Sequence, residues 1–201
     1  MNTAHRTTVA LYGGAFDPPH VAHVMSVAAV LSAYPVEAVW VLPVYLHPLG
    51  KAPTPWVERL ALCRDAFAIF GDRVQVREDE RLVGGAGRTL DLLHHLQRGH
   101  QTKDFRLVIG SDQLTIRHKW HRFDEICRLA PPIVLGRPGH PVPPPFSAAI
   151  TMPQWSSTDA RAALARGELP TWLPHAVRAR IQRQGLYGTT ARGAAADLDD
   201  A

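Results

Sequence analysis

Residues 13–25, GGAFDPPHVAHVM, combine residue types that could hold a phosphorylated ligand. Gly13 and Gly14 would let the backbone turn and let a ligand approach it without a side chain in the way. His20 and His23 are three positions apart at the start of a predicted helix, so both rings share one face. Free N–H groups and the positive end of the helix dipole lie at the same place. The segment therefore predicts a site for a polyphosphate anion, with the imidazoles expected to add positive charge.

This segment is neither the GxGxxG fingerprint nor the GxxxxGK(S/T) phosphate loop. A simpler alternative is that one histidine caps the helix while the other packs in the core. The preceding glycines and Asp17 favour the phosphate site over that alternative.

A second candidate phosphate site lies late in the chain, in WSSTDAR (155–161). Ser157 and Thr158 stand at the start of a predicted helix, where their hydroxyls and free N–H groups could cradle phosphates while Arg161 supplies charge. A plain helix cap is the alternative, because Ser and Thr are favoured there in any case. Together with the opening segment, phosphate binding is favoured. Lys51, in HPLGKAP, stands on a loop that could close over the phosphates.

Composition points to a soluble protein with anionic partners. The 201 residues carry a formal charge of +4 and a pI near 9.4, without a dense Lys/Arg run or a basic and aromatic stripe, so nucleic acid is not expected. The polar start MNTAHRTT is not a signal peptide, and the apolar stretch VMSVAAVLSA is about half a membrane span. Cys63 and Cys127 are predicted to be buried free thiols in a reducing compartment, so we expect a cytoplasmic protein.

Short β-branched runs alternate with helical patterns along the chain. This alternation predicts a doubly wound α/β fold with a parallel sheet, followed by C-terminal helices in the same single domain. We expect the domain to span residues 1–188 and the tail 189–201 to be disordered. The strands are predicted at 8–12, 37–43, 73–78, 106–110, 132–136 and 148–152, and the helices at 20–33, 56–70, 89–98, 121–129, 158–166 and 174–185, with a Pro-rich loop over 136–146.

The opening segment GGAFDPPHVAH resembles the GG(S/T)F(D/N)PxHxGH motif of the HIGH-type nucleotidyltransferase superfamily. More narrowly, the chain resembles bacterial nicotinate-mononucleotide adenylyltransferases over residues 8–188. Four further segments match that family in order: LVIGSDQL (107–114) its IIGxDxL, KW (119–120) its lysine or threonine before tryptophan, WSSTDAR (155–161) its ISSTxIR, and LPHAVRARIQRQGLYG (173–188) its closing helix.

The resemblance implies an enzyme that joins the 5′-phosphate of a pyridine mononucleotide to the α-phosphorus of ATP and expels pyrophosphate. Such an acceptor phosphate is mostly dianionic at neutral pH and needs no general base. The site must hold two anions in line, with Mg²⁺ carried by the phosphates and no metal cage of protein ligands. The implied catalytic residues are His20, His23, Arg161 and Lys51. The implied ATP-binding residues are Gly13, Gly14, Ala15, Phe16, His20, His23, Gly110, Asp112, Ser157, Thr158 and Arg161.

The acceptor is expected to contact Asp17, Arg88, Thr89 and Trp120. The resemblance implies that Trp120 stacks on the cationic pyridine ring, whereas a packing tryptophan is the alternative. Where the family has SYT this chain has GRT, and we expect Arg88 or nearby N–H groups to receive the carboxylate of the acid form. The preference for acid or amide stays open.

Other functions remain open at this point. A related enzyme could use nicotinamide mononucleotide or phosphopantetheine as acceptor, or transfer a cytidylyl group. A non-catalytic nucleotide-binding regulator on the same fold is the alternative from another class. Ala15 for Ser or Thr, Ala22 for Gly, and the GRT loop are the departures from the family pattern. Assembly into a homo-oligomer is also left open.

Overall fold

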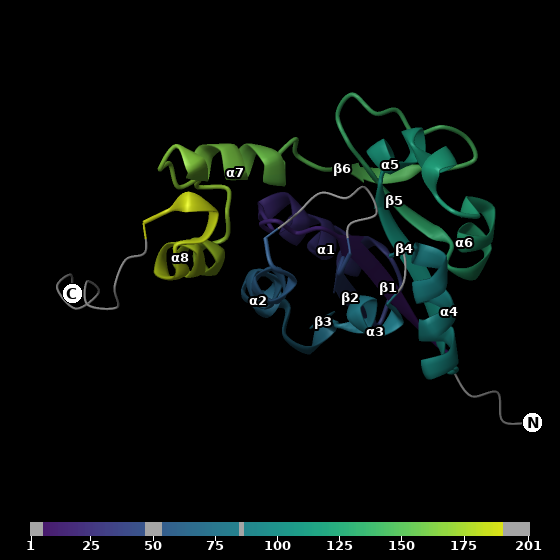
Figure 1. Cartoon of the computed structure of the whole chain (residues 1–201). Helices are drawn as coiled ribbons and strands as arrows, with labels where there is room; N and C mark the ends of the chain where they lie inside the picture. Colours follow the sequence, from purple (N-terminus) through teal and green to yellow (C-terminus); the bar gives the residue numbers. More distant parts are fainter. Residues whose placement is uncertain (1–5, 47–53, 85–86, 191–201) are drawn as a thin grey trace, which may run out of the picture.

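A six-stranded sheet forms the centre of the computed structural model, which describes residues 6–46, 54–84 and 87–190 (Figure 1). All five strand pairings are parallel, and the strand order is β3-β2-β1-β4-β5-β6. The order of the strands reverses at β1, as in a doubly wound sheet. The strands are β1 (Thr7–Gly14), β2 (Ala38–Pro43), β3 (Val74–Val76), β4 (Lys103–Gly110), β5 (Pro132–Gly136) and β6 (Ala148–Thr151).

Helices cover both faces of this sheet. One face packs against α1, α2, α7 and α8, and the other against α4, α5 and α6. The helices and 3-10 turns are α1 (Val21–Ala33), α2 (Trp56–Phe67), η1 (Ala68–Arg73), α3 (Asp79–Val83), α4 (Thr89–Gly99), α5 (Ser111–Thr115), η2 (Arg117–Lys119), α6 (Phe123–Leu129), α7 (Ser157–Ala165), α8 (His175–Gln184) and η3 (Leu186–Gly188).

Alternation along the strands builds the two layers of the core. In β1, Ala10 and Tyr12 face one layer, whereas Val9 and Leu11 face the other. Every residue of β2 is buried, as expected for a strand covered on both faces. β1 ends at Gly14, so the opening histidine segment follows at the carboxyl edge of the sheet.

The predicted α/β fold is confirmed, with each predicted strand and long helix present. The sequence patterns did not predict α3, α5 or η2, because five or three residues are too short for a helical period. Both cysteines are free, and Cys127 is only half-buried where burial was expected. The expected tail falls largely outside the described residues, since 191–201 are not described.

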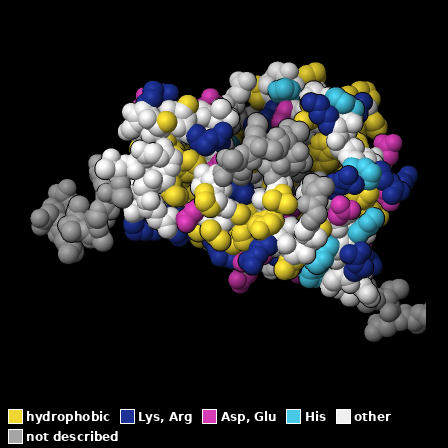
Figure 2. Space-filling view, in the orientation of Figure 1, with side chains coloured by type: hydrophobic (Ala, Val, Ile, Leu, Met, Phe, Trp, Pro, Cys, Tyr) yellow, Lys and Arg dark blue, Asp and Glu magenta, His cyan; other side chains and the backbone are white. Residues whose placement is uncertain are grey.

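Two further features concern the length of the helices and the hydrophobic side chains exposed on the surface. None of the helices in the described ranges is long and apolar enough to cross a membrane. Exposed hydrophobic side chains gather over α2 and α3 in Figure 2, and they include Val57 and Leu82.

Candidate active site

The two glycines that end β1 have different surroundings. A Cβ atom on Gly14 would lie 3.1 Å from the Phe16 ring, whereas a Cβ atom on Gly13 would meet nothing within 4 Å. Phe16 itself has a positive φ of 48° and is 1% exposed. Its ring packs edge-on against His23 and Phe67, with centroids 5.0 and 6.0 Å away. The side chain of Phe16 therefore supports the site from the core, in place of the ATP contact expected for this residue.

His20 and His23 stack on each other at the start of α1. Their ring centroids are 3.7 Å apart with 26° between the planes, so the predicted shared face is confirmed. The N–H of His20 donates to Nδ1 of His23 at 3.1 Å. A neutral His23 must then carry its proton on Nε2, which makes Nε2 a hydrogen-bond donor. Nδ1 of His20 is buried and has no hydrogen-bond partner among the described residues.

The expectation that these histidines carry positive charge at pH 7 is wrong. Burial lowers the pKa of His20 to about 4, and burial together with neighbouring His20 lowers the pKa of His23 well below its ordinary value. Both rings are therefore neutral at pH 7. They can offer hydrogen bonds to phosphate oxygens, while Arg161 and Arg137 are the charged side chains at this edge of the sheet.

The start of α7 is bonded directly to the opening segment. Nη1 of Arg161 donates to the backbone carbonyl of Asp17 at 2.7 Å, and the hydroxyl of Ser157 donates to the carbonyl of Pro18 at 2.9 Å. The bonded residues are more than 130 positions apart in the sequence, so the two motifs meet at one edge of the sheet only in the folded chain. The sequence-predicted residues of both phosphate motifs are brought together.

Helix capping at α7 falls on a different serine from the ones predicted to bind phosphate. Ser156 is the N-cap, and its hydroxyl accepts the N–H of Asp159 at 3.1 Å. Thr158 is exposed, and its hydroxyl oxygen lies 3.5 Å from Nη2 of Arg161. The cap alternative therefore applies to Ser156, which leaves the exposed hydroxyl of Thr158 beside the partly exposed guanidinium of Arg161.

Asp17 is turned into the protein. It is 5% exposed, and its two carboxylate oxygens accept the hydroxyl of Tyr187 at 2.9 Å and the N–H of Thr54 at 3.3 Å. These contacts stand in place of the acceptor contact expected for Asp17. A buried carboxylate with two protein donors is a structural anchor for the loop that carries the histidines.

Arg137 is a site residue that the sequence analysis missed. It directly follows β5, and its Nε lies 3.4 Å from Oδ1 of Asp112 at the end of the neighbouring strand β4. Its charge also adds to the lowering of the pKa values of His20 and His23, after burial as the largest cause. The sequence feature that could have identified Arg137 is its position immediately after the carboxyl end of a central strand.

Two further contacts hold the β4 and β5 ends together. The backbone N–H of Arg137 donates to the hydroxyl of Ser111 at 2.8 Å, and that hydroxyl donates to the carbonyl of His140 at 2.8 Å. A Cβ atom on Gly110 would lie 2.2 Å from Oδ1 of Asp112, so the Asp112 carboxylate would have to move to admit a larger residue there. Gly110 and Asp112 thus lie at the same edge as the histidines, as predicted.

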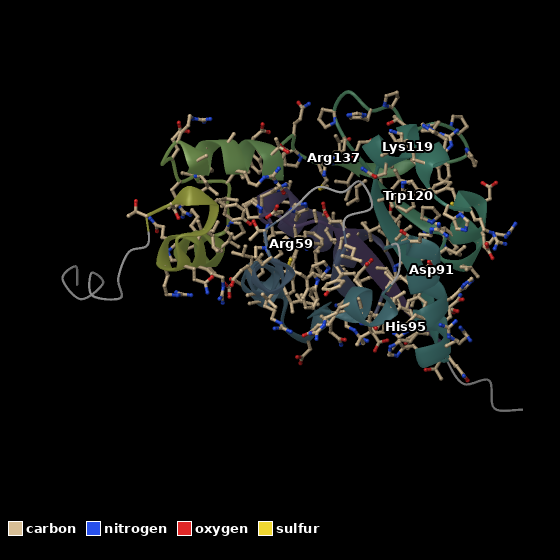
Figure 3. The ribbon with its side chains drawn as sticks, viewed as in Figure 1. Arg59, Asp91, His95, Lys119, Trp120 and Arg137 are labelled. Carbon is tan, nitrogen blue, oxygen red and sulfur yellow. The ribbon has the colours of Figure 1, made fainter. Side chains whose placement is uncertain are left out.

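Arg59 was also missed, and it ties three loops together. Its guanidinium is buried and donates to the carbonyls of Ala15, Val44 and Thr54 at 2.7, 2.7 and 2.9 Å. Ala15 thereby contributes its backbone to the packing of the opening segment. Lys51, predicted on the intervening stretch, lies outside the described residues. In Figure 3, Arg59 lies beside α2, whereas Arg137 and Trp120 lie on the side of α5.

The acceptor candidates lie on the α4 and α6 side of the sheet. Arg88 is the N-cap residue of α4 and Thr89 is its first residue. Trp120 follows η2, is half-buried, and packs edge-on against Phe123 with centroids 5.8 Å apart. A cavity of about 530 Å³ is lined by Trp120 and by Arg117, His118, Arg122, Phe123, Asp124, Glu125 and Arg128.

Comparisons with known proteins identify the family and the fold. The profile of the cytidylyltransferase-like family matches residues 11–163. The chain is 42% identical over 185 residues to a "Probable nicotinate-nucleotide adenylyltransferase" of Anaeromyxobacter dehalogenans, covering 89% of this chain and 96% of that protein. It is 37% identical over 181 residues to a protein of the same name from Myxococcus xanthus, covering 90% and 94%.

The fold also matches a solved structure described as "Plasmodium falciparum nicotinic acid mononucleotide adenylyltransferase complexed with NaAD". The TM-score is 0.74 at 18% identity, and the match covers 90% of this chain and 98% of that one. At that identity the match concerns the fold. With the family profile and the relatives above, the chain belongs to the cytidylyltransferase-like nucleotidyltransferases, in the family of the nicotinate-nucleotide adenylyltransferases.

Proposed function

We propose that this protein transfers the AMP moiety of ATP to nicotinate mononucleotide, giving nicotinate adenine dinucleotide and pyrophosphate. One observation carries the proposal: the start of α7 is bonded to the loop before α1, so Arg161, His20 and His23 share one edge of the sheet. Neutral donors beside a fixed guanidinium suit a triphosphate.

The reaction needs positioning and charge neutralisation more than proton transfer. An oxygen of the acceptor's 5′-phosphate attacks the α-phosphorus of ATP, and the bond from that phosphorus to the bridging oxygen of the β-phosphate breaks. The electron pair leaves with pyrophosphate. Arg161 and Arg137 would neutralise charge on the leaving group, while Nε2–H of His23 would donate to a phosphate oxygen. The attacking phosphate is already ionised, so no residue has to act as a base.

Nucleotidyltransferases of this family generally depend on a metal ion, and we infer Mg²⁺ for this one. The described residues contain no group of three or more His, Cys, Asp or Glu side chains that could cage an ion. Such an ion would be carried largely by phosphate oxygens and water, with Asp112 as a candidate carboxylate at the strand ends. When bound, Mg²⁺ would neutralise charge on the phosphates.

The acceptor side of the proposal rests on Trp120, Arg88 and Thr89. Trp120 lines the cavity beside α6, and an indole face suits the cationic ring of a pyridine nucleotide. Arg88 at the start of α4 would receive the carboxylate of the acid form. Lys51 is proposed as a phosphate contact from the sequence, and the cytoplasm as the protein's location.

Pyrophosphate release from ATP tests the function. Release that depends on nicotinate mononucleotide is the expected result, with nicotinamide mononucleotide and phosphopantetheine as the competing acceptors. Preference for either competitor would replace the proposed acceptor. Tight ATP binding without turnover on any of the three would instead favour a nucleotide-binding regulator.

The role of Arg88 has its own test. Arg88→Ala should lower kcat/KM for the acid mononucleotide more than for the amide, because only the acid offers a carboxylate to the guanidinium. An unchanged ratio of the two kcat/KM values would remove Arg88 from the acceptor site.

A further inference from the structure

Asp17 places a buried negative charge beside the arginine that the proposed function assigns to the phosphates. Oδ2 of Asp17 lies 3.9 Å from Nη1 of Arg161, at the limit of an ion pair. The same Nη1 donates instead to the backbone carbonyl of Asp17 at 2.7 Å. A short, direct ion pair between the two side chains would neutralise charge that the triphosphate needs. The geometry of Asp17 therefore bears directly on the strength of phosphate binding.

Two other donors hold the carboxylate in its observed position. Oδ1 accepts the hydroxyl of Tyr187 at 2.9 Å, and Oδ2 accepts the N–H of Thr54 at 3.3 Å. Tyr187 is 170 positions away in the sequence, in the last described turn of the chain. Burial raises the pKa of its hydroxyl, as does the charge of Asp17, so the phenol stays protonated and remains a donor.

The backbone at Tyr187 is set in an uncommon conformation. Its φ and ψ are 59° and 27°, in the left-handed region that non-glycine residues seldom adopt. The turn begins after Gly185 at φ 64° and ends at Gly188 at φ 80°, where glycine takes these angles without steric cost. A tyrosine kept in this region indicates that its side-chain contacts define the turn.

We propose that Tyr187 is a positioning residue for adenylyl transfer, whose hydroxyl holds the Asp17 carboxylate away from Arg161 and so leaves the guanidinium available to the triphosphate. This inference rests on the proposed function. Tyr187 acts through Asp17 and touches no reacting atom. Without the hydroxyl, Oδ1 loses its donor, and the carboxylate can satisfy this oxygen by turning toward the Arg161 guanidinium, which already lies 3.9 Å from the other oxygen, Oδ2.

The test compares Tyr187→Phe in two backgrounds, the natural chain and Asp17→Asn. In the natural chain, Tyr187→Phe should lower kcat/KM for ATP roughly tenfold, chiefly through KM for ATP, and leave KM for the acceptor within about twofold. In the Asp17→Asn chain the same change should have no further effect, since a neutral amide cannot compete for the guanidinium. Tyr34→Phe, at the end of α1, is the matched control and should change neither constant.

Two results would overturn the inference. An equal loss in both backgrounds would mean that Tyr187 serves only the fold, and an unchanged KM for ATP in the natural chain would mean that its hydroxyl does not matter. Thermal unfolding of each variant shows whether it is folded. If the natural chain proves inactive, the Kd of an α,β-methylene analogue of ATP is measured on the same four proteins. A Kd weakened by Tyr187→Phe only where Asp17 is present still supports the inference, although the proposed function would have failed.

Discussion

His20 and His23 are neutral at pH 7, because burial lowers the pKa of both rings. Neutral imidazoles attract a triphosphate less strongly than imidazolium ions do. Burying a neutral ring, however, costs less free energy than burying a charged one. The hydrogen bond from the His20 N–H also fixes which nitrogen of His23 accepts. The histidines thus provide directed hydrogen bonds to the phosphates, while Arg161 and Arg137 provide positive charge.

Protein stability should fall in mild acid because of His20. Above its unfolded pKa of about 6.5 the ring is neutral in both states, so it adds no pH dependence. As the pH falls from 6.5 toward the folded pKa of about 4, only the unfolded chain takes up the proton. The free energy of unfolding should therefore drop by up to about 1.4 kcal/mol per pH unit from this residue.

Urea unfolding at pH 7.5, 6 and 5 measures this effect. His20→Asn should make the pH dependence shallower by the His20 contribution while the His23 contribution remains, and His118→Asn, at an exposed position, should leave it unchanged. Identical slopes for the natural chain and for His20→Asn would contradict the pKa shift.

Arg137→Met should weaken the binding and reaction of ATP, because it removes a positive charge from the carboxyl edge of the sheet. We expect kcat/KM for ATP to fall roughly 10- to 100-fold, since groups that stabilise developing charge have effects of that order. Arg98→Met, on the exposed side of α4, is the control. Steady-state kinetics with both substrates varied would reveal the change, and equal kinetics for the two variants would exclude Arg137 from the site.

The starts of α1 and α7 meet at the carboxyl edge of the sheet, and this meeting of two elements creates the site. Both helices point N–H groups and dipoles toward the same region. Val21, the first residue of α1, already donates its N–H to the carbonyl of Trp172, while Ser157 ties α7 to Pro18. The site thus depends on how the two helices are docked as well as on which side chains they carry.

Substitution of the two adjacent serines at the start of α7 distinguishes the stability of this helix from its docking onto the loop before α1. Ser156→Ala removes the N-cap and should cost about 1 kcal/mol of stability while leaving KM for ATP nearly unchanged. Ser157→Ala removes the bond to Pro18 and should raise KM for ATP several-fold, because Arg161 loses its fixed place. Thermal unfolding and kinetics on both variants measure the two effects. A larger kinetic effect from Ser156→Ala than from Ser157→Ala would contradict this assignment.

Across the whole molecule, the sheet and the long helices could be predicted because each depends on local hydrophobic period and on turn residues. The phosphate motifs could be predicted because their residues stand close together in sequence. Arg137, Arg59 and Tyr187 could not, since each acts on segments that only the folded chain brings near. The lowered pKa values of the histidines were missed for the same reason: burial is a property of the packed structure.

The C-terminal part of the chain packs beside the carboxyl edge of the sheet. Arg180 of α8 pairs with Asp65 of α2, and Tyr187 reaches Asp17 from the following turn. Helices from opposite ends of the sequence are therefore held against one another. This arrangement gives the last described segment a direct connection to the opening loop.

A crystal structure of the protein with the α,β-methylene analogue of ATP tests the central claim most directly. The predicted result has phosphate oxygens within about 3.2 Å of Nε2 of His23 and of the Arg161 guanidinium in the same complex. A triphosphate bound elsewhere, with neither group in contact, would contradict the claim that these two motifs form one phosphate site.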